Sequence, residues 1–264
     1  MEVTFKVYRK DPEKDGKPGR SNYTIDIPED ATVLDGLLKI RDEIDSTLAF
    51  RASCLRGYCG DCMVRVSGRA RLSCVAKVTA FTQKAPEISL DPLRIVPVIK
   101  DLVFDWDAFM WNKIRAVQPW LEPKEPASDG ENLIPDAAMK DLRKVMSCYY
   151  CGMCDEGCTV LPVDFNFLGP AALTKAYRFA FDPRGKETRE RLKILEEPKG
   201  IWDCVHCYEA DEHCPRGIEP TKRIIALRDL ALSWVLPMRK SLDITRALPR
   251  RLKRAAGWMR EDWL

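Results

Sequence analysis

The chain has 264 residues, and its 43 Lys and Arg against 40 Asp and Glu give a formal net charge of +3. With 45% hydrophobic and 31% charged residues, it is too apolar for a disordered chain and too charged for one that lies mostly within a membrane. We expect no transmembrane helix, because the most apolar stretch near the end, 230–238, is far shorter than the roughly 20 residues that a span needs.

The first hundred residues carry the pattern of a small β-rich domain with one helix. Alternating apolar and polar residues or short apolar runs mark the expected strands, which are 3–8, 23–27, 63–66 and 72–78. Apolar residues at helical spacing over 33–44 predict a helix, for which Thr32 or Asp30 is a suitable N-cap. The sequence therefore predicts a small ferredoxin-like domain over 1–105.

The composition changes after residue 105. Residues 106–135 form a connector rich in proline and tryptophan, for which we predict a short helix over 106–117 and a polar loop over 122–131. Helical spacing returns in a second unit, 136–235. The helices expected there are 137–146, 170–181, 188–195 and 220–234. A basic tail, 236–264, ends the chain.

The most informative feature is the eleven cysteines, which fall into groups of four, four and three. The first residues show no secretory signal, so we expect free thiols in a reducing cytosol and no disulfide framework. Cysteines gathered in this way indicate ligands for metal ions or iron–sulfur clusters. Their positions are Cys54, Cys59, Cys62, Cys74, Cys148, Cys151, Cys154, Cys158, Cys204, Cys207 and Cys214.

The first group has the Cys-x4-Cys-x2-Cys spacing, with a fourth cysteine downstream, of plant-type 2Fe–2S sites. Its members are Cys54, Cys59, Cys62 and Cys74. Two irons need four thiolates, and here a tight loop supplies three while a neighbouring strand supplies the fourth. Gly57 and Gly60 allow the close backbone approach that such a loop requires. Zinc is the alternative, although four-cysteine zinc sites usually consist of two separated short pairs.

The second group follows the Cys-x2-Cys-x2-Cys-x3-Cys run of bacterial ferredoxins, with Thr159 in place of the usual proline. In that arrangement the first three cysteines hold one cubane and the fourth, Cys158, reaches the other cluster. The reciprocal motif should end in Cys-Pro, and Cys214-Pro215 provides that ending. The predicted ligands of a 4Fe–4S cluster are Cys148, Cys151, Cys154 and Cys214.

The third group leaves its cluster type open. Its predicted ligands are Cys158, Cys204 and Cys207. Ala210 stands where a further cysteine would complete a cubane, and three thiolates suit a 3Fe–4S cluster. The alternative is a second 4Fe–4S cluster with a non-cysteine ligand on its fourth iron. The nearby candidates for that ligand are Asp211, Glu209 and His213.

The cysteine groups and the sequences around them resemble the iron–sulfur subunits of succinate dehydrogenase and fumarate reductase. The resemblance covers about residues 1–235. Its segments are VLDGLLKIRDEIDSTLAFRASC (33–54), RGYCGDCMVRVSG (56–68), DPLRIVPVIKDLVFD (91–105) and FLGPAAL (167–173), followed by Arg178 and Asp182-Pro183-Arg184. The predicted fold class is α+β: an N-terminal 2Fe–2S ferredoxin-like domain of the β-grasp type, then an all-α domain resembling bacterial two-cluster ferredoxins.

This resemblance implies an oxidoreductase-complex subunit of the tricarboxylic acid cycle and respiratory chain. It would pass electrons between the FAD of a partner flavoprotein subunit and quinone bound at a membrane-anchor interface. Dicarboxylate chemistry would belong to the flavoprotein, since the sequence has neither G-x-G-x-x-G nor a P-loop. The protein would lie peripherally on the cell membrane of a prokaryote, at the cytoplasmic face. Nucleic acid is not an expected partner.

Two departures from the family's pattern concern the third group. Family members space its two later cysteines six positions apart, whereas Cys204 and Cys207 here are three apart. Quinone-reducing members carry Pro-Ser and a tryptophan after the fourth cysteine of the first run, whereas residues 159–162 here are TVLP. A divergent, non-membrane-spanning anchor is therefore an alternative, and the basic tail is suited to an anionic lipid surface. Alternative functions are the iron–sulfur subunit of a thiol-dependent fumarate reductase and a stand-alone multi-cluster electron carrier.

Overall fold

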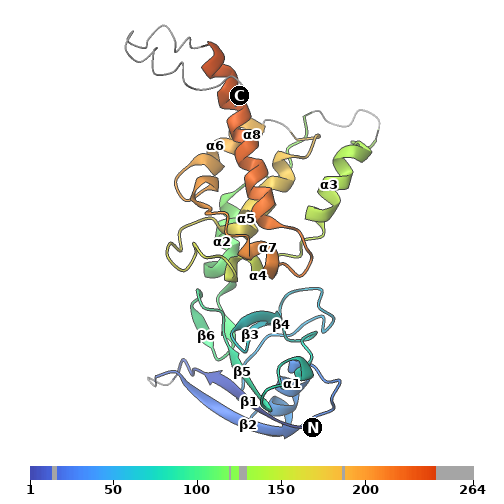
Figure 1. Ribbon diagram of the computed structural model, residues 1–264, viewed down its shortest axis with the longest axis vertical. Coiled ribbons are helices and arrows are strands. Elements are labelled where there is room, and N and C mark those ends of the chain that lie inside the picture. Colours follow the sequence, from blue (N-terminus) through green and yellow to red (C-terminus); the bar gives the residue numbers. More distant parts are fainter. Residues whose placement is uncertain (14–16, 119, 125–129, 186–187, 242–264) are drawn as a thin grey trace.

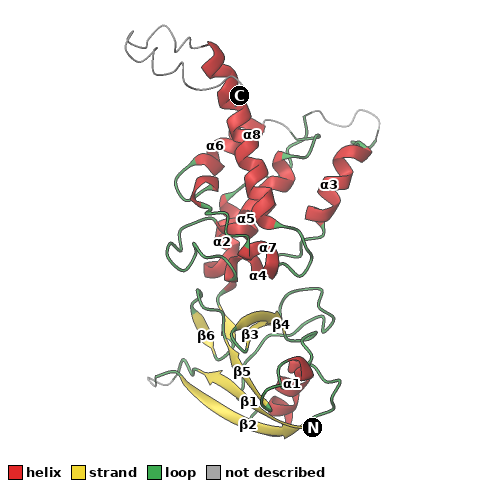
Figure 2. Ribbon diagram, viewed as in Figure 1, coloured by secondary structure: helices red, strands yellow, loops and turns green. Residues whose placement is uncertain are grey.

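The computed structural model describes residues 1–13, 17–118, 120–124, 130–185 and 188–241 (Figure 1). Its strands gather at one end of the molecule and most of its helices at the other (Figure 2). In these residues no helix combines the length and the apolar character needed to cross a membrane. The arrangement follows the predicted order of a β-rich part and then a helical part.

Five strands form a mixed sheet in the order β2-β1-β5-β3-β4. Their bounds are β1 Glu2–Arg9, β2 Gly19–Asp26, β3 Met63–Val66, β4 Arg69–Leu72 and β5 Glu87–Asp91. β1 pairs antiparallel with β2 and parallel with β5. Because two parallel strands cannot be joined by a hairpin, the chain must cross the sheet between β1 and β5. Helix α1 (Val33–Glu43) lies in that crossing, and its Leu37 and Ile40 are fully buried in the core that the sheet forms.

Two local features fix α1 against the sheet. Thr32 forms a capping box, in which its side chain accepts from the Asp35 N–H at 3.2 Å and its own N–H donates to Asp35 Oδ2 at 2.8 Å. Thr32, and not Asp30, is thus the N-cap. Gly36 lets the helix approach β1 closely, because a side chain at this position would overlap the ring of Phe5.

The predicted strand over 72–78 is wrong. β4 ends at Leu72 and the chain turns at once, with the Val75 N–H donating to the Leu72 carbonyl at 3.1 Å. A 3₁₀ turn, η1 (Val78–Ala80), follows. Leu72, Ala76 and Val78 are buried in this turning segment while Val75 is exposed, and the turn directs Cys74 toward the preceding cysteine loop.

A short connecting region follows β5. It contains the hairpin of β6 (Val98–Lys100) and β7 (Val103–Phe104), the π-helical turn η2 (Asp107–Trp111) and α2 (Asn112–Ala116). The helix predicted over 106–117 is thus confirmed, partly as a π-helix, whereas the sequence pattern does not predict β5 or the hairpin. Asp101, only 1% exposed, ties the hairpin to β1 by accepting from Arg9 Nε at 3.0 Å and Lys10 N at 2.9 Å.

The remaining described residues form a helical unit. Its helices are α3 (Asp136–Met146), α4 (Met153–Glu156), α5 (Gly169–Ala180), α6 (Thr188–Glu196), α7 (Glu209–His213) and α8 (Pro220–Ser241). The four predicted helices are present as α3, α5, α6 and α8, and the predicted tail beyond Ser241 lies outside the described residues. Helix α5 is central, since it contacts α2, α3, α4, α6 and α8.

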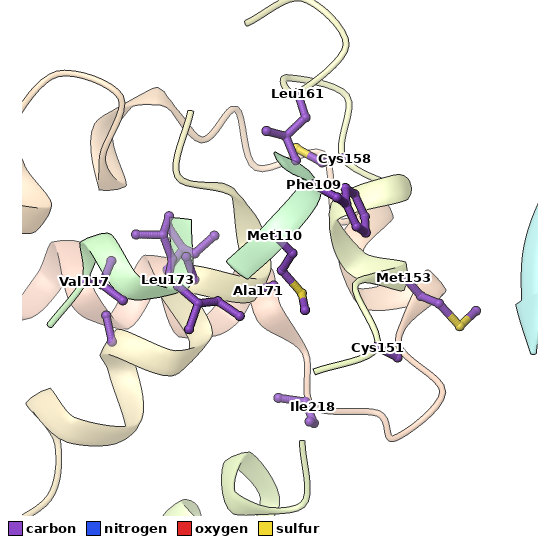
Figure 3. Close-up of a cluster of buried hydrophobic side chains, with 14 of the residues drawn as sticks. Phe109, Met110, Val117, Cys151, Met153, Cys158, Leu161, Ala171, Leu173 and Ile218 are labelled. Carbon is purple, nitrogen blue, oxygen red and sulfur yellow. The ribbon is translucent and has the colours of Figure 1, made fainter. Parts of the chain in front are cut away.

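One cluster of buried apolar side chains extends through both parts of the molecule. It joins Leu72 and Cys74, in and after β4, to Phe109 and Met110 of η2 and Leu173 of α5. Figure 3 shows Phe109, Met110 and Leu173 within this cluster. Protein interiors pack about as densely as organic crystals, so a shared core leaves little freedom between the parts it joins. This core therefore holds the cysteine-bearing segments in fixed relative positions.

Candidate metal centres

The first cysteine group lies in a loop between α1 and β3 whose N–H groups point at its sulfurs. Cys54 Sγ accepts from the N–H groups of Arg56, Tyr58 and Cys59, at 3.3–3.4 Å. These donors stabilise the thiolate and lower the pKa of Cys54 to about 6. The Gly57 N–H donates to Cys74 Sγ at 3.1 Å, which brings the fourth cysteine to the loop.

The strands beside the loop bring the other cysteines of the group together. Cys62 precedes β3 and Cys74 follows β4, and these strands pair with Met63 opposite Leu72. The Ser73 N–H also donates to the Cys62 carbonyl at 3.1 Å. Burial raises the pKa of Cys74 to about 12, and the neighbouring thiols of Cys62 and Cys54 add to the rise. All four predicted ligands of the 2Fe–2S cluster thus lie around one loop.

The second group lines a single pocket in the helical unit, together with Thr174 of α5. The cysteines that line it are Cys148, Cys151, Cys154 and Cys214. The arrangement of these four cysteines fits the predicted cubane. Four thiols from two distant motifs surround one space, and N–H groups donate to Cys148 and Cys214 at 3.4 Å, as cluster ligands receive them.

Burial makes these thiols unfavourable as free anions. It raises the pKa of Cys148 to about 11 and that of Cys151 to about 12, and it raises the pKa of Cys154 well above its ordinary value. Bound iron would supply the positive charge that such thiolates need. In the described residues, no three His, Cys, Asp or Glu side chains converge closely enough for one metal ion.

The third group meets where α4 ends and the segment before α7 begins. Burial raises the pKa of Cys158 to about 11, and the charge of nearby Cys207 adds to the rise. Burial likewise raises the pKa of Cys204, and the charge of Cys207 adds to that rise. Thr159 Oγ1 donates to Cys207 Sγ at 3.3 Å, so the residue that replaces the usual proline joins the two motifs. Arg228 Nη2 donates to the Cys204 carbonyl at 2.7 Å and fixes this turn.

Two of the candidate non-cysteine ligands, Asp211 and His213, interact with other groups of the chain. Asp211 Oδ1 accepts from the Thr221 N–H at 2.6 Å, in the first turn of α8. His213 Nδ1 lies 2.7 Å from the Glu209 carbonyl, and its ring packs so closely on Gly157 that a Cβ there would be 2.6 Å from the ring. Ala210 is buried and offers no ligand. Three cysteines are therefore the ligands that the local structure favours.

The first and second groups are in direct contact. Gly60 has a φ of +82°, and a Cβ on it would lie 2.5 Å from Cys151 Cβ. The rings of Tyr58 and Tyr149 stack beside this contact, with centroids 6.2 Å apart. The sequence pattern indicates that Gly60 gives the loop conformational freedom. That Gly60 also lies against Cys151 depends on how the two units pack.

A buried carboxylate links the same two units. Glu156, 3% exposed at the end of α4, accepts from the Arg94 N–H at 3.1 Å and from Arg94 Nε at 3.2 Å. Arg65 of β3 lies 3.6 Å away, and Arg94 also donates to the Glu156 carbonyl at 2.7 Å. Sequence reasoning missed this pair, because only the fold brings residues 94 and 156 together.

Comparison with known proteins matches each half of the chain to a domain family. A 2Fe-2S iron-sulfur cluster binding domain matches residues 4–111, and a 4Fe-4S dicluster domain matches residues 144–218. The succinate dehydrogenase iron-sulfur subunit of Paracoccus denitrificans is 34% identical over 88% of this chain and 89% of its own length. The fumarate reductase iron-sulfur subunit of Mycobacterium tuberculosis is 33% identical over 88% of this chain and 97% of its own length.

A solved structure supports the fold. A chain of the Mycobacterium smegmatis Sdh1 complex in the apo form matches with a TM-score of 0.79 at 24% identity, covering 86% of this chain and 94% of that one. The predicted fold class and the order of 2Fe–2S and 4Fe–4S domains are thereby confirmed. The chain is an electron-transfer subunit that carries 2Fe–2S and 4Fe–4S clusters, and it belongs to the family of succinate dehydrogenase and fumarate reductase iron–sulfur subunits.

Proposed function

We propose that each cysteine group ligates one cluster and that the chain conducts electrons between the FAD of a flavoprotein subunit and quinone at a membrane anchor. The observation that carries this proposal is that the three groups lie in series, each next to the following one. When bound, the clusters supply the one-electron redox couples that protein side chains lack. The chain's own residues hold them, fix their spacing and keep water from them.

The proposed ligands follow the three groups. Cys54, Cys59, Cys62 and Cys74 hold the 2Fe–2S cluster. Cys148, Cys151, Cys154 and Cys214 hold the 4Fe–4S cluster. Cys158, Cys204 and Cys207 hold the third, a 3Fe–4S cluster, because three thiolates suit that cluster and the Asp211 and His213 side chains are engaged in hydrogen bonds or packing.

Two features support the serial arrangement of the three cysteine groups. Gly60 places the first loop on Cys151, and α4 carries Cys154 within it and Cys158 two residues after its end. Electron transfer rates fall steeply with distance, so these short links favour a path from the first group through the second to the third. The proposed units are a 2Fe–2S domain over 1–105, a connector over 106–135, a two-cluster domain over 136–235 and a basic tail over 236–264.

Exposed apolar side chains flank Cys158 and Cys204 in the chain, and we propose that they form one surface, which we call the third-group surface. Its residues are Val163, Phe165, Trp202, Val205 and Tyr208. Val163 is 88% and Val205 65% exposed, and surfaces of this kind mark interfaces when they gather at one place. We propose that the membrane anchor covers this surface with quinone at the interface, so that the protein lies peripherally at the cytoplasmic face of a prokaryotic cell membrane.

Replacing Val163 by aspartate tests that surface. Val163 makes little contact within the chain, so Val163→Asp should leave the stability of the isolated subunit unchanged. An unpaired charge in an interface opposes binding, and we expect the membrane-bound fraction to fall about tenfold. The matched control is Ile44→Asp, since Ile44 is 54% exposed at the end of α1. Equal retention of both variants in the membrane fraction would contradict the proposed anchor surface.

The ligand assignment is tested by two serine variants of the complex. Cys207→Ser should change or remove the near-isotropic low-temperature EPR signal of an oxidised three-iron cluster and leave the other two clusters unaltered. Cys59→Ser should affect only the 2Fe–2S signal, because Cys59 is not among the proposed ligands of the other two clusters. An unchanged spectrum for Cys207→Ser would show that Cys207 is not a ligand. Co-purification with an FAD-containing subunit tests the partner.

A further inference from the structure

Thr174 has a buried hydroxyl that no group of the described residues satisfies. It lies on the central helix α5, is 2% exposed, and its Oγ1 has no hydrogen-bond partner. A buried hydroxyl without a partner is unfavourable, and most native proteins avoid it. Threonine in a helix commonly satisfies its hydroxyl by donating to a carbonyl one turn earlier, but Thr174 does not. Since no described residue supplies the acceptor, a group bound beside Thr174 is the available one.

The position of Thr174 identifies that acceptor. Thr174 lines the same pocket as Cys148, Cys151, Cys154 and Cys214. The exposed surface within this pocket is almost entirely apolar, so the group that fills it, and not a neighbouring side chain, is the available acceptor. An iron–sulfur cluster presents sulfides and thiolate sulfurs, which accept hydrogen bonds from hydroxyl and N–H donors.

We propose that the Thr174 hydroxyl donates a hydrogen bond to a sulfur of the 4Fe–4S cluster and thereby raises its reduction potential. The cluster gains one electron from its donor on reduction and returns it on oxidation, so its reduced form carries one more negative charge. A donor at its sulfur stabilises the more negative form, which shifts the potential upward. The inference rests on the proposed ligand set of the second group.

The next residue of α5 supports the same effect independently. The Lys175 ammonium lies over the rings of Tyr150, Trp120 and Phe179, at 4.4, 5.0 and 5.4 Å from their centroids. From there it interacts favourably with the negative form of Cys148. Packing on aromatic faces keeps this positive charge beside the second group. Helix α5 therefore presents a hydroxyl donor and a cation to the same cluster.

The test compares Thr174→Val with Thr174→Ser in the intact, cluster-loaded complex, by EPR-monitored redox titration. Valine keeps the shape of threonine without the donor, and serine keeps the donor. For Thr174→Val we expect the reduced-to-oxidised ratio of the 4Fe–4S cluster at a fixed poise to fall about tenfold, equal to about 59 mV for one electron. Thr174→Ser should stay near the wild-type value, and the 2Fe–2S cluster should not shift in either variant.

The outcomes separate this proposal from the ligand assignment. A wild-type potential in Thr174→Val would overturn the role of Thr174, and so would an equal shift of all clusters. If Thr174→Val does not retain the cluster, Thr174→Ala against Thr174→Ser gives the same comparison. An unaltered 4Fe–4S signal in Cys148→Ser would instead contradict the ligand set on which the proposal rests.

Discussion

Replacing Gly60 by alanine is expected to destabilise the cluster-loaded chain by about 2–5 kcal/mol. Two effects add at this position. An alanine held at a left-handed φ, here +82°, costs about 1–2 kcal/mol. The new Cβ would also lie 2.5 Å from Cys151 Cβ and 2.9 Å from Cys151 Cα, and overpacking of this kind costs about 1–3 kcal/mol. The Cys151 backbone cannot yield easily, because it lies in the shared core.

Gly60→Ala should also slow electron transfer between the first two clusters. If the two units separate to accommodate the methyl group, the first and second cysteine groups move apart and electron transfer between their clusters slows. Denaturant unfolding of the loaded chain measures the stability, and freeze-quench EPR of 2Fe–2S reoxidation measures the transfer.

Gly68 supplies the matched control for Gly60. Its φ is +90°, but an added Cβ would meet nothing within 4 Å, so Gly68→Ala carries only the backbone strain of about 1–2 kcal/mol. Gly68→Ala should leave the transfer rate unchanged. Equal losses of stability and rate in the two variants would show that contact with Cys151 is not what Gly60 provides.

The sequence predicts those parts of the molecule that local pattern determines. Cysteine spacing indicates the grouping of the ligands, because a cluster needs several thiolates from one short loop. The local pattern offers Thr32 or Asp30 as the N-cap, of which the structure has Thr32, and it predicts β3 at 63–66, where the structure has it. The ligand assignment that follows from the spacing stays a prediction until the spectra are recorded.

Long-range packing explains what the sequence does not predict. The segment 72–78 has strand-like composition, yet it turns, and the Val75 and Ala76 N–H groups both donate to the Leu72 carbonyl at 3.1 Å. Thr174 looks like an ordinary polar residue within an apolar helix until the fold places it in the pocket of four cysteines. The pair of Arg94 and Glu156 lies 62 residues apart in the chain, and no local pattern connects such positions.

Replacing Arg94 by alanine is expected to destabilise the loaded chain by about 1.5–3 kcal/mol. The variant removes two hydrogen bonds that involve a charged group, from Nε to the Glu156 carboxylate at 3.2 Å and from Nη2 to the Glu156 carbonyl at 2.7 Å. Glu156 is 3% exposed, so solvent cannot replace the lost donors. The backbone N–H of residue 94 and Arg65 remain as partners, which limits the loss.

The same change should loosen the link between the two units, because Glu156 belongs to α4, between Cys154 and Cys158. We expect weaker magnetic coupling between the reduced 2Fe–2S and 4Fe–4S clusters in the EPR spectrum, together with the loss of stability. Arg115→Ala is the control: Arg115 pairs with Asp107 at 2.6 Å, but both are more than half exposed, and such pairs contribute about 0.2–1 kcal/mol. If Arg94→Ala behaves like Arg115→Ala in both measurements, the buried pair does not hold the units together, and the shared apolar core alone fixes the spacing of the cysteine groups.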